Sequence, residues 1–163
     1  MANSHIISIL GGKGGVGKTI VASNLACAFQ ANGQKRVLLI DMDSQSCNDQ
    51  NVILGVKSPR TLADLINFSG KLDTQALQSF LTVHPSGLFF IPAAISKMEY
   101  KSMNPEKLDA MLKLLLKVFS VIIIDCGSEV NNPIVTVFEN TTMDTDALWA
   151  YRTWWYCGII QII

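Results

Sequence analysis

The hydrophobic positions of the chain fall into short continuous runs that alternate with longer segments of helical spacing. Runs such as "RVLLID" and "SVIIID" contain no polar alternation, which is typical of strands buried on both faces of a sheet. Segments whose apolar residues recur every three or four positions predict helices between these strands. Strands are predicted at 5–10, 36–41, 88–92 and 120–125, and helices at 18–31, 60–67, 73–81, 104–118 and 132–139.

The alternation of strand and helix predicts the fold class. Strands separated by helices pair in parallel through right-handed crossovers, and the helices then cover both faces of the sheet. The 163 residues are 49% hydrophobic and 16% charged, which is enough apolar material for one folded domain. We therefore expect an α/β protein with a doubly wound, mostly parallel sheet.

The segment between the first strand and the first helix is "ILGGKGGVGKT". Its spacing is that of the phosphate-binding loop, G-x-x-x-x-G-K-T. Glycines let successive backbone N–H groups turn toward one anion, and the start of the following helix adds the positive end of its dipole. This setting favours a nucleotide site over an ordinary glycine turn. The predicted loop comprises Gly12, Lys13, Gly14, Gly15, Val16, Gly17, Lys18 and Thr19, and its glycines form the cradle.

Within this loop the last two residues have separate predicted roles. Lys18 supplies a positive charge to the β- and γ-phosphates, and the Thr19 hydroxyl is a ligand for Mg²⁺.

Aspartates end two of the apolar runs, Asp41 and Asp125. In an open α/β sheet the carboxyl ends of the strands lie beside the phosphate loop, so both carboxylates are candidates to serve Mg²⁺ directly or through water. Asp43, two residues after Asp41, is a candidate to orient an attacking water. For a single aspartate the competing interpretation is a helix cap or turn residue. Two such strands beside a glycine loop favour a role in Mg²⁺ binding for both aspartates.

These motifs together resemble one known family. "GGKGGVGKT" is similar to the deviant Walker A motif of the ParA/MinD family, "VLLIDMDSQ" to its second strand, and "VIIIDCG" to its Walker B strand. The resemblance covers about residues 4–140, and the segment 61–127 is most similar to the CpaE/TadZ branch. It implies a P-loop NTPase of the SIMIBI class.

The resemblance also implies an activity. Members of the family bind and hydrolyse Mg-ATP as ATP-dependent homodimers, and Lys13 corresponds to the lysine that reaches the ATP of the partner protomer. The CpaE/TadZ branch positions pilus assembly and secretion machinery, so pilus, secretion or polar-localisation proteins are the partners it implies. Ile20 stands where the family has a Thr or Ser near the α-phosphate, and no proline follows Asp125 before Pro133.

Three other functions stay open at this point. A ParA/MinD-type partitioning or division-site ATPase would have the same site, and a nucleotide-binding scaffold or inactive fragment would bind without turnover. An iron–sulfur carrier would need a cysteine pair, and the sequence has no C-x-x-C. DNA binding is not supported, because Lys+Arg and Asp+Glu number 13 each and no basic run stands out.

The expected location is the cytoplasm. The first predicted strand begins within five residues of Met1, which leaves no room for a signal peptide, and no window is apolar enough to span a membrane. The resemblance adds peripheral placement at the inner membrane or cell pole. The cysteines are interpreted as small apolar residues in a reducing compartment: Cys27, Cys47, Cys126 and Cys157.

The last part of the sequence differs from the rest in composition. Residues 1–143 are interpreted as the N-terminal part of the ATPase domain, whereas 144–163 contain all three tryptophans and show no helical or strand period. This favours a truncated or out-of-frame segment over a basic membrane tether, since Arg152 is its one cationic side chain. The sheet is then expected to have four strands, an open edge and an incomplete nucleotide pocket, with poor solubility or weak turnover as the result.

Overall fold

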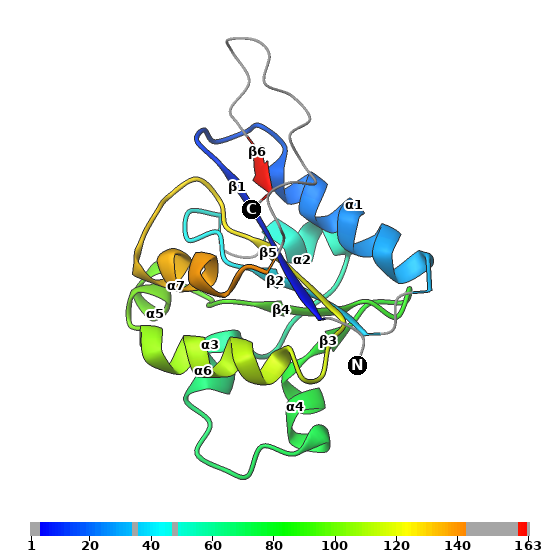
Figure 1. The fold of residues 1–163 in the computed structure, drawn as a ribbon, viewed down its shortest axis with the longest axis vertical. Coiled ribbons are helices and arrows are strands. Elements are labelled where there is room, and N and C mark those ends of the chain that lie inside the picture. The colour runs from blue at the N-terminus through cyan, green and yellow to red at the C-terminus, as the bar shows by residue number, and fades with distance from the viewer. Residues whose placement is uncertain (1–3, 34–35, 47–48, 143–159, 163) are drawn as a thin grey trace.

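The computed structural model describes residues 4–33, 36–46, 49–142 and 160–162, and for the last of these the backbone alone. They form one six-stranded sheet in the order β3-β4-β2-β5-β1-β6 (Figure 1). The four inner strands are parallel to one another, and the edge strands β3 and β6 run antiparallel to their neighbours. The predicted mostly parallel α/β sheet is confirmed. Its strands are β1 (His5–Gly11), β2 (Val37–Asp41), β3 (Thr82–Val83), β4 (Phe89–Pro92), β5 (Val121–Asp125) and β6 (Ile160–Ile162).

Helices cover both faces of this sheet. One face packs against α1 (Lys18–Ala31) and α2 (Asp49–Leu54), which lie on the opposite side of the sheet from α3 and α6 (Figure 1). The other face contributes the larger of two hydrophobic clusters. The helices packed there are α3 (Leu62–Ile66), α4 (Thr74–Phe80), α5 (Lys97–Lys101), α6 (Pro105–Leu115) and α7 (Asn132–Asn140).

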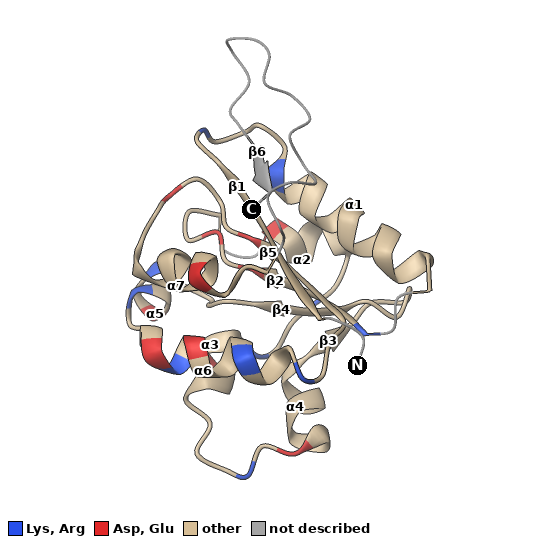
Figure 2. Ribbon diagram, viewed as in Figure 1, with Lys and Arg blue, Asp and Glu red and all other residues tan. Residues whose placement is uncertain are grey.

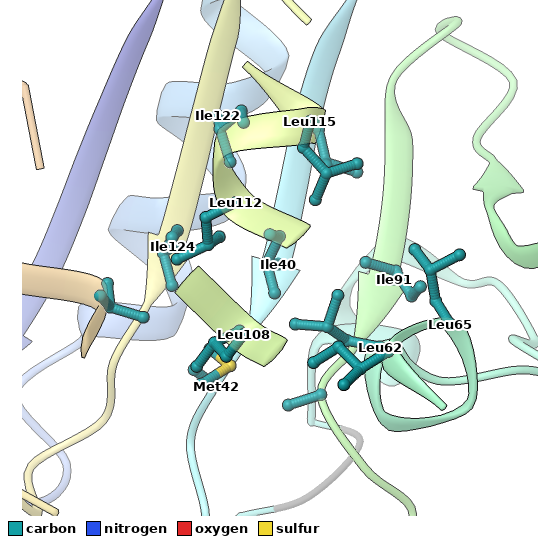
Figure 3. Close-up of a cluster of buried hydrophobic side chains, with 14 of the residues drawn as sticks. Ile40, Met42, Leu62, Leu65, Ile91, Leu108, Leu112, Leu115, Ile122 and Ile124 are labelled. Atoms are coloured by element: carbon teal, nitrogen blue, oxygen red, sulfur yellow. The ribbon is translucent and has the colours of Figure 1, made fainter. Parts of the chain in front are cut away.

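The larger cluster shows why the central strands are continuously apolar. Successive residues of a strand point to opposite faces, so Ile122 and Ile124 contact one helical layer while Ile123 contacts the other. Figure 3 shows the face where α6 lies across β2 and β5. The α6 side chains packed there recur at helical spacing and are fully buried: Leu108, Leu112 and Leu115.

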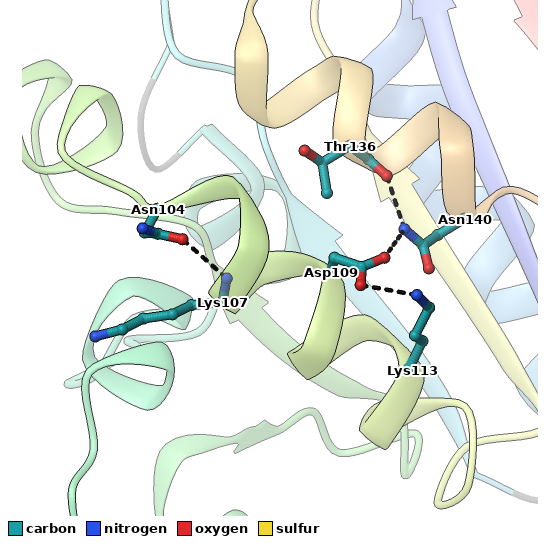
Figure 4. A network of polar contacts seen from close by, with 6 residues as sticks. All are labelled: Asn104, Lys107, Asp109, Lys113, Thr136 and Asn140. Carbon is teal, nitrogen blue, oxygen red and sulfur yellow. Dashed lines mark hydrogen bonds and ion pairs between the residues drawn. The ribbon is translucent and has the colours of Figure 1, made fainter.

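A polar network joins α6 to α7, the helix that follows β5 (Figure 4). Asn140 donates from Nδ2 to Asp109 Oδ1 at 2.9 Å and to the Thr136 carbonyl at 2.9 Å. Lys113 donates to the other Asp109 oxygen at 2.8 Å, and this hydrogen bond lowers the pKa of the Asp109 carboxyl below its usual value. The network connects α6 to the second half of α7.

Four elements differ from the sequence-based expectation. Helices α2 and α5 and strands β3 and β6 were not predicted, because segments of two to six residues are too short to display a period. The expected four-strand sheet with an open edge is therefore wrong. Residues Ile160–Ile162 pair antiparallel with β1, Ile9 opposite Ile162, so this edge of β1 is hydrogen-bonded.

Most of the atypical segment 144–163 lies outside the described residues, and its interpretation as truncated or out-of-frame stays a prediction. Among the helices that the structure describes, none has the length and apolar character needed to cross a membrane.

Candidate functional site

The phosphate loop connects the end of β1 to the start of α1. Gly15 and Gly17 have φ angles of 75° and 87°, in the left-handed region that side chains with a Cβ rarely adopt. Gly17 is the N-cap of α1, so no side chain covers the first N–H groups of that helix. The loop thus presents unobstructed backbone donors at a helix N-terminus, which is the arrangement that binds phosphate.

Lys18 is the first residue of α1 and is 5% exposed. Its ammonium donates a hydrogen bond to the Lys13 carbonyl at 3.0 Å, which uses one of its three N–H donors. Its aliphatic stem crosses Gly11 so closely that a Cβ built there would lie 2.7 Å from Lys18 Cδ. The position of the buried ammonium therefore depends on a glycine that the motif spacing does not include. The signal in the sequence was that the glycine run begins at 11, one residue before the motif.

Replacing Gly11 with alanine is expected to lower the free energy of unfolding by about 1–3 kcal/mol, because the added methyl overpacks the buried Lys18 stem. Gly12→Ala is the matched control, since a Cβ there meets nothing within 4 Å and its φ is not left-handed. It should change stability by less than about 0.5 kcal/mol. Urea unfolding of both variants without nucleotide measures the difference. Equal stabilities would contradict the close approach.

Asp41 and Asp125 end adjacent parallel strands and are register partners, so the two carboxylates lie side by side. They are 4% and 0% exposed. Burial, then repulsion from Asp125, raises the pKa of Asp41 to about 8. Burial also raises the pKa of Asp125, opposed by a hydrogen bond from the Thr19 side chain. The structure thus brings Thr19 to Asp125, and Asp125 to its neighbour Asp41.

These residues fit a divalent cation. Asp41 Oδ2 is buried and has no hydrogen-bond partner among the described residues. A buried carboxylate oxygen without a hydrogen-bond partner, beside a second carboxylate, is available as a ligand for a cation. Mg²⁺ prefers one or two carboxylates together with phosphate oxygens. Thr19 places a hydroxyl at the same point. The pair and Thr19 are therefore the residues that would hold Mg²⁺.

Asp43 lies in the loop after β2 and is partly buried. Its Oδ1 accepts from Gln45 N at 2.9 Å and its Oδ2 from Ser46 Oγ at 2.7 Å. Gly127, whose φ is 67°, packs so closely that a Cβ there would lie 2.6 Å from Asp43 Cγ. The loops after β2 and β5 therefore hold Asp43 between them, and each carboxylate oxygen keeps a further lone pair for water.

Charge is distributed unevenly around the site. Figure 2 shows basic residues in the segment from β1 to the start of α1 and acidic residues in the loops after β2 and β5. The remaining predicted residues of the loop are at its surface: Gly12, Lys13 and Gly14 are exposed, Val16 is partly buried, and Ile20 is 51% exposed. The charge of Lys13 is therefore exposed to solvent.

Gln50 on α2 is a site residue that the sequence-based reasoning missed. It is 0% exposed, and its Nε2 donates to Asp125 Oδ2 at 3.1 Å. Nothing in the local pattern marked α2 as a helix, so a glutamine within it carried no signal.

Comparison with known proteins shows the family of the chain. A family model described as an AAA domain matches residues 4–144. Over 126 residues the chain is 36% identical to the septum site-determining protein MinD of Thermotoga maritima, covering 74% of this chain and 43% of that protein. It is 32% identical over 135 residues to the antiactivator FleN of Pseudomonas aeruginosa, covering 81% and 46%. The chain thus spans less than half the length of either curated relative.

A solved structure supports the fold. MinD of Pyrococcus horikoshii, complexed with Mg-ADP, superposes with a TM-score of 0.69 at 28% identity. The match covers 85% of this chain and 55% of that one.

Proposed function

We propose that this chain, which belongs to the AAA domain family, is a P-loop ATPase of the ParA/MinD type that binds Mg-ATP at Gly12–Thr19 and hydrolyses it as a dimeric switch. The observation that carries the proposal is the buried Lys18 beside an uncapped helix N-terminus, with the Asp41–Asp125 pair next to it. The bond broken is the β–γ phosphoanhydride, and catalysis relies on positioning and charge neutralisation.

Each residue of the site then has a role. The loop glycines and the N-terminus of α1 hold the β-phosphate, and Lys18 neutralises charge on the β- and γ-phosphates. Asp43 orients the attacking water through its remaining lone pairs, and Asp41, Asp125 and Thr19 serve Mg²⁺. When bound, Mg²⁺ neutralises the developing phosphate charge. Ile20 stands where the family has a Thr or Ser near the α-phosphate, and it has no hydroxyl to donate, so this chain would make one contact fewer with that phosphate than the family does.

The cellular role we propose is that of a partitioning or division-site ATPase. The relatives named MinD and FleN support it better than they support the positioning of pilus or secretion machinery. The latter rests on the resemblance of residues 61–127 to the CpaE/TadZ branch. A DNA-segregation role would show as salt-dependent retention on nonspecific DNA.

A paired assay tests the proposed activity. Nucleotide binding is measured by calorimetry with Mg-ATP, and turnover by phosphate release from the same preparation. Binding with release supports an ATPase, whereas binding without release identifies a scaffold. Absence of binding contradicts the proposal as a whole.

The dimer is tested through Lys13. Lys13→Ala is expected to leave nucleotide binding by the monomer within about twofold, because Lys18 and the loop amides remain. ATP-dependent dimerisation and hydrolysis should be lost, because the exposed ammonium would no longer reach the ATP of the partner. Light scattering with and without ATP measures dimerisation, and phosphate release measures hydrolysis. Normal dimerisation of the variant would reduce Lys13 to a solvated loop residue.

A further inference from the structure

The most deeply buried uncharged polar side chain of the site belongs to Gln50, in the first turn of α2. Its amide joins three elements of the site. Nε2 donates to Asp125 Oδ2 at 3.1 Å and to the Thr19 carbonyl at 3.2 Å, and Oε1 accepts from Ser23 Oγ at 2.7 Å. The ends of β5, α1 and α2 are thus connected through one side chain.

These contacts use the whole hydrogen-bonding capacity that the amide directs into the site. Both Nε2 hydrogens are engaged, one on a carboxylate and one on a carbonyl, and Oε1 shares the single Ser23 hydroxyl hydrogen with the Thr19 carbonyl, each acceptor lying 2.7 Å from Ser23 Oγ. Rotating the amide by half a turn would place Oε1 against the Asp125 carboxylate and the Thr19 carbonyl, where acceptor would face acceptor. The two acceptors, Asp125 Oδ2 and the Thr19 carbonyl, therefore select one orientation of the Gln50 amide.

The burial pattern of α2 indicates that the glutamine at position 50 does more than fill space. Two residues of this helix are buried, Gln50 and Leu54, and Leu54 packs in the hydrophobic cluster of that face. An apolar side chain at position 50 would fill the space without the desolvation cost of an amide. A fully buried amide that instead donates to Asp125 is expected where the orientation of that carboxylate matters.

We propose that Gln50 is a positioning residue for the metal site: its amide fixes the Asp125 carboxylate and the Thr19 backbone in the arrangement that Mg²⁺ with ATP requires. This inference rests on the proposed function. Gln50 does not touch nucleotide or metal in it, and acts through Asp125 and Thr19. Groups that orient a metal-serving carboxylate contribute about ten- to hundredfold to metal affinity.

The test separates metal-dependent from metal-independent binding. In Gln50→Met, a change of similar volume, the Kd for ATP with Mg²⁺ is expected to rise about tenfold or more. The Kd in EDTA should stay within about twofold, because the phosphate loop and Lys18 are unchanged. Gln78→Met, the same substitution at an exposed position of α4, is the matched control and should change neither value.

A second variant and a double mutant keep the inference testable if Gln50→Met folds poorly. Ser23→Ala removes the hydroxyl that holds Oε1 and should weaken binding with Mg²⁺ selectively, by a smaller factor. In an Asp125→Asn background, the Ser23→Ala and Gln50→Met effects should fall below about twofold.

The outcomes distinguish the two proposals. Failure of the wild-type protein to bind ATP in either buffer would overturn the proposed function. Binding by the wild-type protein with equal losses in Mg²⁺ and EDTA, or no loss at all, would overturn the role of Gln50 and leave the ATP site standing.

Discussion

Lys18→Ala is expected to abolish ATP binding, with a loss of about 3 kcal/mol or more, or roughly a hundredfold in Kd. The ammonium is buried, and its hydrogen bond to the Lys13 carbonyl leaves further donors for phosphate oxygens. No other lysine or arginine of the described residues is buried, so a charge inside the glycine loop has no local replacement. Calorimetry with Mg-ATP measures the loss.

A second substitution separates the charge of Lys18 from its packing. Lys18→Met keeps an apolar stem over Gly11 and removes the ammonium, so it should retain the stability of the wild-type protein and still lose ATP binding. Lys57→Ala, at an exposed position distant in sequence from the loop, is the control and should bind normally. Affinity like that of the wild-type protein in either Lys18 variant would rule out the assignment of the loop.

Asp41→Asn is expected to stabilise the metal-free protein by about 2–5 kcal/mol at about pH 8. Burial and repulsion from Asp125 raise the pKa of Asp41 from 3.8 to about 8. Between these values the folded state binds the proton more tightly than the unfolded state does. The stability of the wild-type protein should therefore fall as the pH rises from about 4 to 8, and the variant should lack this contribution.

Denaturant unfolding in EDTA at about pH 5 and about pH 8 measures this difference. Adding Mg²⁺ with ATP should reverse the order at the higher pH, because asparagine lacks the charge that a divalent cation needs. The control is Asp109→Asn, a partly exposed carboxylate whose pKa is lowered rather than raised. A stability of the wild-type protein that does not change over this range would contradict the buried carboxylate pair.

The phosphate loop and the central strands could be predicted because their physical causes are local. A glycine run between an apolar strand and a helix determines the loop, and continuous apolar runs such as Val121–Asp125 belong to strands buried on both faces. The boundaries of β5 and α7 were accordingly predicted to within one residue. Both metal-serving aspartates followed from the same runs, since they are the residues at which the strands end.

Other parts of the site depend on contacts between distant segments. The sequence shows neither that the Lys18 stem crosses Gly11 nor that the Gln50 amide reaches Asp125 across 75 positions. Helix α2 is too short to reveal its buried face by periodicity, and β6 exists as a strand through its pairing with β1.

The sequence by itself therefore determined the α/β class, the phosphate loop and the identity of the carboxylates, because each is encoded in consecutive residues. The tertiary structure alone decided the strand order, the two edge strands and the side-by-side placement of Asp41 and Asp125. It also decided the burial that raises the pKa values of both carboxyls, and it leaves Asp41 Oδ2 without a hydrogen-bond partner in the part of the chain that the structure describes. The physical reason is that desolvation and charge repulsion depend on which groups surround an atom in space, and a linear spacing does not specify those neighbours.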